Sequence, residues 1–355
     1  MNIYCYFVEP ASYTLDLAKY VYDQNNIDYC FIKSSSYAKS KQKTCKLCLQ
    51  NQSVYKRLKH LITIFRKHDL IIINGYNNYP FILTFLFNFF SRKKKYIAIE
   101  SDTQFAIPKN LLIRFAKWIY LNMIFRNKYV LGFAGGNFTH KKLFSYYGME
   151  QDRIFLMPMI VDNFKFYQEQ KQFPTTFTFL YVGRLVKHKN VEGVIRQFNR
   201  YFSDKNVILR IVGSGNEGDR LRRKYASEKV LFLGKKVVPE LIKEFQDSSC
   251  FLCPSLFEPW GLVVNEAMSS GLPVIATKYV GASFDLIKDK ETGFVVEDMN
   301  DFGAKMLDLY NDPELLIKFS VNATKLMKES WNYGLYDNCL KTVIKRINNV
   351  GKFSY

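Results

Sequence analysis

The sequence lacks an apolar run long enough to cross a membrane. Its longest run, residues 80–90, has about half of the roughly 20 residues that a membrane-spanning helix needs. Residues 1–8 are typical of a short strand followed by polar residues, and not of a secretory leader. We therefore expect a globular, cytoplasmic protein without a transmembrane segment.

Cysteine and histidine are too few, and too irregularly spaced, to predict a disulfide framework or a metal site. The seven cysteines are odd in number, which indicates reduced thiols. Cys45 and Cys48 form a single Cys-x-x-Cys pair, but a zinc site normally needs a second pair or two histidines at matching spacing. The sequence predicts no metal site and no bound cofactor.

Acidic residues are scarce in the first half of the chain. Residues 1–160 hold 23 Lys and Arg against 9 Asp and Glu, whereas the remainder holds 28 against 23. A basic surface attracts polyanions such as nucleic acid or an anionic lipid surface, although a merely solvated lysine-rich surface is an open alternative. No nucleic-acid-binding motif accompanies the charge, so we expect no nucleic-acid partner and keep that function only as the weakest alternative.

The order of predicted elements indicates two α/β domains. A chain of 355 residues exceeds the usual size of one hydrophobic core, and short apolar strands alternate with helical spacing in both halves. The pattern predicts two doubly wound parallel sheets. We expect a first domain over residues 1–161, a linker over 162–176, a second domain over 177–330 and a final helix within 331–355.

Two loops of the second half carry glycines, and one of them also carries basic residues, directly after predicted strands. Gly183 and Arg184 follow the strand at 178–182, with Lys189 five residues after the arginine, and Gly213 and Gly215 follow the strand at 207–212. Glycine lets a backbone turn close to a ligand, and Arg with Lys can grip a diphosphate through charge-assisted hydrogen bonds. Taken alone, each loop fits a solvated surface turn equally well.

A third loop carries a stronger pattern, Glu258-Pro-Trp-Gly261, followed by a helix that contains Glu266. A helix that begins near Gly261 offers unpaired N–H groups and a positive dipole end to an anion. If the intervening segment were helical, the two carboxylates would lie roughly 12 Å apart, about the length of a diphosphate. Spacing alone leaves open that both are ordinary surface charges.

These motifs together resemble the retaining glycosyltransferases of family 4, which have the GT-B fold. The resemblance covers residues 178–296 and is carried by Gly183-Arg184 with Lys189, Gly213-Ser-Gly215, Glu258-x7-Glu266, Gly271-Leu-Pro and Glu291-Thr-Gly. It implies two Rossmann-like doubly wound domains facing a central cleft, with the acceptor bound by the first domain and a nucleotide diphosphate sugar by the second. It also implies that the final helix crosses back to the first domain.

The resemblance implies a role for each matching residue. Arg184 and Lys189 would hold the donor diphosphate together with the backbone N–H groups around Gly261, Leu262 and Val263. Glu266 would bind the ribose hydroxyls, and Glu258 would contact the sugar and stabilise the charge that develops at its anomeric carbon. The implied reaction retains the anomeric configuration and needs no metal. Asn190 stands where many relatives have glycine, and residues 281–285 depart from the usual Gly-Gly-x-Pro-Glu.

The first half matches the family poorly. Relatives often have a histidine after a middle strand that touches the donor sugar, whereas this chain has Glu100 and Asp102 there, which we consider as substitutes beside the alternative of a plain polar loop. The stretches 80–95 and 111–126 combine apolar and basic residues, which is typical either of core helices with basic ends or of segments that lie on an anionic membrane. We expect a glycosyltransferase of bacterial surface-polysaccharide synthesis with a glycan or lipid-linked acceptor, peripheral at the inner membrane face. A nucleotide-sugar epimerase of the same fold is the main alternative.

Overall fold

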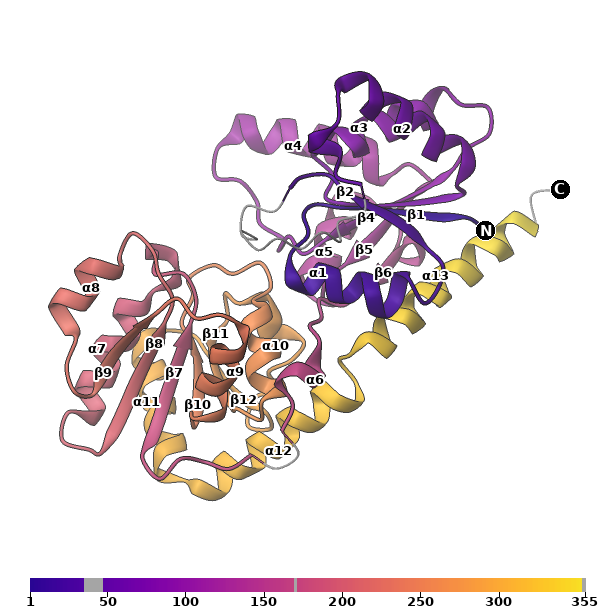
Figure 1. Ribbon diagram of the computed structural model, residues 1–355. Coiled ribbons are helices and arrows are strands. Elements are labelled where there is room, and N and C mark those ends of the chain that lie inside the picture. The colour runs from indigo at the N-terminus through magenta and orange to yellow at the C-terminus, as the bar shows by residue number, and fades with distance from the viewer. Residues whose placement is uncertain (35–46, 169–170, 353–355) are drawn as a thin grey trace. The chain divides into compact units, whose positions relative to one another are not determined.

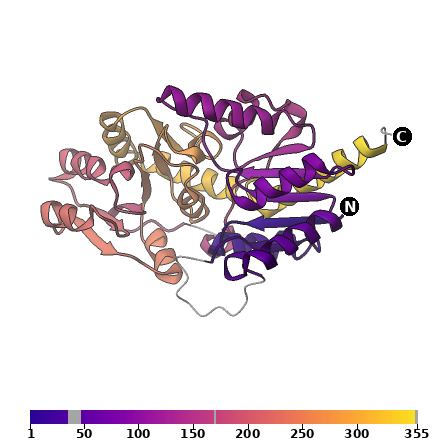
Figure 2. The same ribbon diagram turned by 90° about the horizontal axis from the view of Figure 1, so that it is seen from above.

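The computed structural model describes residues 1–34, 47–168 and 171–352, and it divides into two compact units (Figures 1 and 2). The first unit contains residues 1–159 together with 333–355, and the second contains Ile160–Asn332. Cys45 of the Cys-x-x-Cys pair lies outside the described residues. Each unit is built on a six-stranded sheet whose strand pairs are all parallel, so the predicted doubly wound architecture is confirmed.

The first sheet has the strand order β2-β1-β3-β4-β5-β6. Its strands are β1 (Ile3–Phe7), β2 (Asp28–Phe31), β3 (Leu70–Asn74), β4 (Tyr96–Ser101), β5 (Val130–Ala134) and β6 (Ile154–Leu156). Its helices are α1 (Ser12–Leu17), which continues as the π-helix η1 (Ala18–Tyr22), then η2 (Leu49–Asn51), α2 (Val54–Lys67), α3 (Tyr79–Phe90), α4 (Leu111–Phe125), α5 (Thr139–Tyr146), η3 (Gln151–Arg153) and α13 (Tyr333–Lys352). The central strands are nearly all apolar because helices cover both faces of the sheet.

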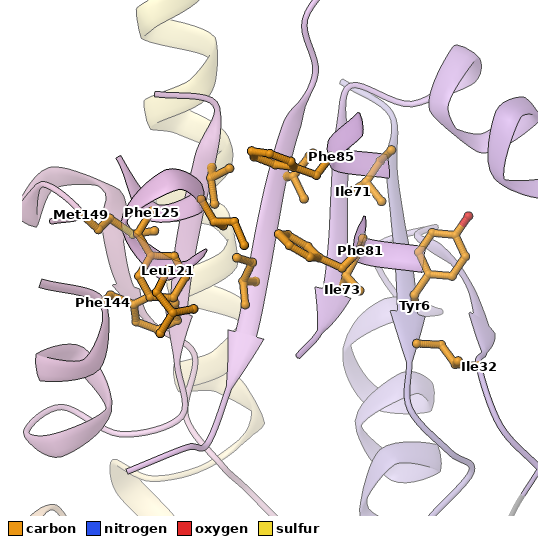
Figure 3. Packing of buried hydrophobic residues seen from close by; sticks show 14 of the residues in the cluster. Tyr6, Ile32, Ile71, Ile73, Phe81, Phe85, Leu121, Phe125, Phe144 and Met149 are labelled. Carbon is orange, nitrogen blue, oxygen red and sulfur yellow. The ribbon is translucent and has the colours of Figure 1, made fainter. Parts of the chain in front are cut away.

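One face of this sheet is covered by α2, α3 and α4. Alternate strand residues such as Ile71 and Ile73 point to that face, where they pack with Phe81 and Phe85 of α3 (Figure 3). Leu121 of α4 belongs to the same core cluster. The helices begin where the sequence supplies a polar cap, because the side chains of Ser53, Asn78 and Asn110 each accept a hydrogen bond from the first helical turn.

The C-terminal helix α13 is part of the first unit. Its Tyr333 stacks on Tyr20 of η1 with ring centroids 5.0 Å apart. Tyr336 lies fully buried and its hydroxyl is 2.9 Å from that of Tyr22. Arg346, further along α13, forms an ion pair with Asp152. The last helix therefore packs on the first sheet through aromatic rings, a hydrogen bond and an ion pair.

The second sheet has the strand order β12-β11-β10-β7-β8-β9. Its strands are β7 (Phe177–Val182), β8 (Val207–Val212), β9 (Val230–Gly234), β10 (Cys250–Cys253), β11 (Val274–Thr277) and β12 (Gly293–Val296). Its helices are α6 (Asn163–Phe166), η4 (Lys187–Lys189), α7 (Val191–Phe202), α8 (Gly218–Tyr225), α9 (Val238–Gln246), α10 (Leu262–Ser269), η5 (Gly281–Phe284), α11 (Met299–Asn311) and α12 (Pro313–Glu329). Within the described ranges, no helix combines the length and apolar character that crossing a bilayer requires.

The described residues of the expected linker, 162–168 and 171–176, lie within the second unit. The side-chain amide of Asn163 donates to the carbonyl oxygens of Met327 and Trp331, at 2.7 and 2.9 Å, and its oxygen accepts from Ser269 at 3.0 Å. The ammonium group of Lys171 donates to the last carbonyl groups of α9, and burial lowers the pKa of this lysine to about 8. Hydrogen bonds to α9, α10 and α12 thus hold this segment against the second sheet.

Candidate functional site

The loops that follow β7, β8 and β9 are joined through their backbones. The amide of Gly183 donates to the carbonyl of Val212 at 3.0 Å, and the amide of Gly213 donates to that of Gly234 at 2.8 Å. The amide of Leu185 donates to Ser214 at 2.9 Å. Because all three strands are parallel, their carboxyl ends meet at one edge, which is the edge where ligands bind in open α/β sheets.

The close contact between the loops after β7 and β8 requires glycine at positions 213 and 215. A Cβ atom on Gly213 would lie 1.8 Å from the carbonyl oxygen of Gly183, and one on Gly215 would lie 2.2 Å from that of Leu185. Gly213 also has a φ of +139°, which side chains rarely allow. The sequence pattern predicted a turn that approaches a ligand, and the structure adds that these glycines bring the loop after β8 against the loop after β7.

The basic loop after β7 places two cationic groups near each other. Arg184 is exposed, and its carbonyl oxygen accepts a hydrogen bond from the hydroxyl of Tyr181 at 3.0 Å. Lys189 ends η4 with a largely covered side chain. Burial lowers the pKa of Lys189, and the charge of Arg184 lowers it further. Two neighbouring cationic groups suit a negatively charged partner, and the carboxylate of Glu258 is one such partner for Lys189.

Asn190 explains one departure from the family pattern. It has a left-handed backbone with a φ of 53°, and it joins η4 to α7. Glycine, which the resemblance implies at this place, enters the left-handed region freely, and asparagine is among the few other residues that tolerate it. The substitution therefore preserves the turn that positions Lys189.

The loop after β10 brings Glu258 to Lys189. The two side chains form an ion pair and are only 16% and 13% exposed. The amide of Glu258 donates to Tyr279 and its carbonyl accepts from Gly281, both at 3.0 Å, so the loop after β11 fixes its backbone. A further bond of 2.8 Å runs from the amide of Leu256 to the carbonyl of His188 in η4. The predicted diphosphate-binding lysine and the predicted sugar-contacting glutamate thus lie in contact.

The buried side chain of Trp260 holds the loop after β10 in place. Its ring is 1% exposed and stacks on Trp331, with centroids 5.5 Å apart and planes 10° from parallel. The indole N–H donates to Asn265 of α10 at 2.8 Å. The sequence does not predict this stack, because nothing in the spacing of two tryptophans 71 positions apart indicates that they meet.

Gly261 sets the start of α10. Its φ of +98° lies in the left-handed region, and a Cβ atom there would be 3.1 Å from the Glu258 side chain. The helix begins at Leu262, so the N–H groups of Leu262 and Val263 belong to the first turn, whose donors have no partner within a helix. Both residues are partly exposed. The helix start therefore offers N–H groups and a positive dipole end beside Glu258.

Glu266 lies one turn further along α10, four residues after Leu262 and thus near it on the helix surface. Burial raises the pKa of its carboxyl group to about 7. In the described part of the chain, its carboxylate has no hydrogen bond or ion pair. A partly exposed carboxyl group with a raised pKa, in a helix whose start lies beside the ion pair of Lys189 with Glu258, is typical of a ligand-binding position.

The two candidates of the first unit lie in different environments. Glu100 is buried at the end of β4, where its carboxylate accepts hydrogen bonds from the amide of Asn74 and, at 3.0 Å, from the hydroxyl of Tyr336 in α13. Burial raises the pKa of Glu100 to about 7. Asp102 is partly exposed in the loop that follows β4. Glu100 is thus engaged inside the first unit, whereas Asp102 remains the candidate for contact with a substrate.

Comparison with known proteins finds a family model that matches most of the second unit. Residues 163–326 match the model of the family described as glycosyl transferases group 1. A sucrose synthase of Denitrovibrio acetiphilus is 32% identical over 208 residues, which cover 51% of this chain and 26% of that protein. The capsular polysaccharide biosynthesis glycosyltransferase CapM of Staphylococcus aureus is 29% identical over 224 residues, which cover 61% of this chain and 55% of CapM. The chain thus spans less than two thirds of each relative.

Similarity to solved structures covers nearly the whole chain, but only at the level of the fold. The solved structure of HepE from Anabaena, in complex with UDP and glucose, has a TM-score of 0.72 at 15% identity, with 98% of this chain and 100% of that chain covered. This likeness confirms the GT-B fold class that the sequence predicts. The family match and the relatives support membership of the glycosyltransferase superfamily for residues 163–326.

Proposed function

We propose that this chain is a retaining glycosyltransferase that moves a sugar from a nucleotide diphosphate sugar to a glycan or a lipid-linked acceptor. The observation that carries the proposal is the meeting of Lys189 and Glu258 beside the start of α10, with the unpaired carboxyl group of Glu266 one turn away. Cationic groups, helix N–H groups and two carboxyl groups are what a diphosphate flanked by a sugar and a ribose requires.

Each group has a distinct part in the proposal. Arg184, Lys189 and the N–H groups of the first turn of α10 hold the diphosphate. Glu266 accepts hydrogen bonds from the ribose hydroxyls, and Glu258 contacts the sugar. The charge of Lys189 is balanced by its ion pair with Glu258. A bound diphosphate gives Lys189 a second anionic partner, so that the Glu258 carboxylate becomes available to the developing positive charge at the anomeric carbon.

The proposed chemistry depends on stabilising the leaving group. As the bond between the anomeric carbon and the diphosphate breaks, negative charge grows on the phosphate oxygen, where preorganised cations and N–H groups lower the barrier. The same oxygen takes the proton of the acceptor hydroxyl on the face that the acceptor attacks, which retains the anomeric configuration. The protein groups assigned here supply this stabilisation, and the proposal includes no metal ion.

The finer parts of the proposal rest on similarity. The name of CapM describes capsular polysaccharide biosynthesis, and HepE was solved with UDP and glucose. We propose membership of family 4 on the Glu258-x7-Glu266 motif, a role in surface-polysaccharide synthesis, and a uridine nucleotide as the first donor to test. A place at the inner face of the cell membrane is part of the same proposal.

Acceptor-dependent turnover tests the function. A thermal-shift screen over nucleotide sugars comes first, because a ligand at 100 times its dissociation constant stabilises a protein by about 2.7 kcal/mol. We then expect the stabilising donor to release free nucleoside diphosphate only when an acceptor is present, and the NMR spectrum of the product to show the donor's anomeric configuration. Conversion of the donor, without acceptor, into a nucleotide sugar with a different sugar configuration would favour an epimerase. An inverted product would contradict the retaining mechanism.

A further inference from the structure

The outer side of α4 is apolar where a surface helix is normally polar. Leu121, Ile124 and Phe125 fill the side that faces the sheet. The opposite side carries a second set of large apolar residues that are 47–80% exposed: Leu111, Leu112, Phe115, Trp118, Ile119 and Met123. This second set is called the α4 outer face below. A second apolar side of this size on a helix is typical of a covered surface, and nothing in the described part of the chain covers it.

The neighbouring helix α3 repeats the pattern. Figure 1 shows α3 and α4 in one layer over the first sheet. Ile82, Leu86, Phe89 and Phe90 are 42–80% exposed, and they form a stripe that ends at the C-terminus of α3. Directly after it come Arg92 and Lys93, both exposed. Apolar side chains are therefore uncovered on two helices of the same layer.

A shallow groove beside α4 joins aromatic and basic groups. It has a volume of about 360 Å³ and is lined by Phe115, Trp118, Tyr146 and Tyr147, among others, with Arg114 at its wall. The ammonium group of Lys117 lies 5.7 Å from the centre of the Tyr147 ring. Rings with an apolar body and a polar tip, beside long basic side chains, suit the boundary between hydrocarbon and water.

The positive charge around α3 and α4 indicates which kind of partner could cover this surface. Residues 70–149 contain eleven Lys and Arg but only two acidic residues, Glu100 and Asp102. Glu100 is buried and so is Lys95, which is paired with Asp69, so neither contributes to the surface charge, and ten basic residues remain against one acidic residue. A second copy of the chain would present the same positive charge and repel. The surface of a bilayer that contains anionic lipid offers both a negative charge and an apolar interior.

We propose that the α4 outer face, with the exposed end of α3, docks the first unit onto an anionic lipid bilayer. The apolar side chains enter the boundary between head groups and acyl chains, and Arg92, Lys93 and Arg114 contact lipid phosphates. This surface is independent of the donor site, which belongs to the second unit. An enzyme held there meets a lipid-linked acceptor within the membrane plane, so the inference names the surface for the membrane placement proposed above and in that part rests on the proposed function.

Vesicle flotation of the full chain tests the apolar part. We expect it to float at low salt with vesicles of phosphatidylcholine mixed with phosphatidylglycerol, and not with phosphatidylcholine alone. The variant Leu112→Gln/Phe115→Gln/Ile119→Gln should lower the partition coefficient at least roughly tenfold. Ile317→Gln/Val321→Gln is the matched control, because it replaces side chains of α12 that are 54% and 60% exposed, and it should float like wild type.

A second pair of variants tests the contribution of the basic residues to membrane binding. We expect Arg92→Gln/Lys93→Gln to weaken binding roughly tenfold to thirtyfold, and high salt to have a similar effect. Arg222→Gln/Arg223→Gln removes two exposed charges from α8 of the second unit and should leave flotation unchanged. Thermal stabilisation by UDP, measured on every variant, should remain at the wild-type value and so shows that the donor site is intact.

Three outcomes would overturn the proposal. One is the absence of flotation of the wild-type chain with anionic vesicles at low salt. Another is equal flotation of the α4 variant and its α12 control. The third is a wild-type chain that sedimentation shows to be a dimer, with a monomeric α4 variant and no vesicle binding by either, which would assign the α4 outer face to self-association.

Discussion

The two units share one sheet plan but place their reactive and charged residues differently. In the second unit, the candidate site residues lie in loops at the carboxyl ends of strands. Glycines there allow close contact between the backbones of neighbouring loops, and Lys189 forms an ion pair with Glu258. In the first unit, the corresponding end of β4 carries Glu100, whose carboxylate accepts a hydrogen bond from the hydroxyl of Tyr336 in α13. The exposed chemistry of that unit lies instead on its helices, in the α4 outer face.

This difference agrees with the two kinds of ligand proposed above, a diphosphate for the second unit and a lipid surface for the first. A diphosphate is small and highly charged, so its site needs backbone groups and side chains in fixed positions, which short strand-end loops provide. A lipid surface is large and laterally fluid, so a broad apolar face with scattered basic residues is sufficient. The family match to residues 163–326 follows the same division, because fixed geometry restricts the sequence more tightly than a broad surface does.

The largest expected effect contrasts two tryptophans, one from each unit. Trp260→Ala removes a fully buried ring from its stack on Trp331 and should destabilise the second unit by about 3–5 kcal/mol. Trp118→Ala removes a ring that is 47% exposed on α4 and should change the stability by less than about 0.5 kcal/mol. Urea denaturation measures both, and equal losses would contradict the anchoring role of Trp260.

The next effect concerns turnover at the second unit. Glu258→Gln should lower kcat on the order of a hundredfold, because the neutral amide cannot stabilise positive charge at the anomeric carbon. The donor dissociation constant should change much less. Glu297→Gln, at a carboxylate that is 72% exposed and paired with Lys278, is the matched control and should leave kcat unchanged. A Glu258 variant that changes only donor affinity would refute the division of roles between the two glutamates.

A smaller effect is expected on donor affinity. Glu266→Gln should raise the donor dissociation constant roughly tenfold, since a charged hydrogen-bond acceptor becomes neutral. With a pKa of about 7, the wild-type carboxyl group is ionised above that pH and protonated below it. Wild-type affinity should therefore fall between pH 8 and pH 6, whereas the variant should bind independently of pH in this range. Calorimetric titration across this range measures both, and a parallel pH dependence would contradict the assignment.

The smallest effect belongs to the first unit. Burial raises the folded-state pKa of Glu100 from 4.5 to about 7, so its stabilising contribution is complete below pH 4.5 and is lost as the pH rises through 7. Tyr336→Phe removes a hydrogen bond that favours the ionised carboxylate. It should cost about 1 kcal/mol, and more at pH 8 than at pH 5. Tyr333→Phe, in the same helix, is the comparison, and an equal pH dependence in both variants would contradict the role of Glu100.

Much of the fold and part of the candidate site could be predicted because they depend on local sequence. Alternation of apolar strands with helical spacing specified two parallel sheets, and the glycines at 183, 213 and 261 marked loops at strand ends. The described part of the expected linker was harder to place. Its lack of periodicity suggested a free connection, whereas hydrogen bonds from Asn163 and Lys171 to distant helices hold it on the second unit.

By itself, the sequence determined the element order, the loops that carry Lys189, Glu258 and Glu266, and the excess of basic residues in the first half. Only the tertiary structure decided which of these residues meet. The ion pair of Lys189 with Glu258 and the stack of Trp260 on Trp331 join positions about 70 residues apart. Helical spacing shows that α4 is apolar, but which side remains uncovered depends on what the rest of the chain packs against it, and that is a property of the folded molecule.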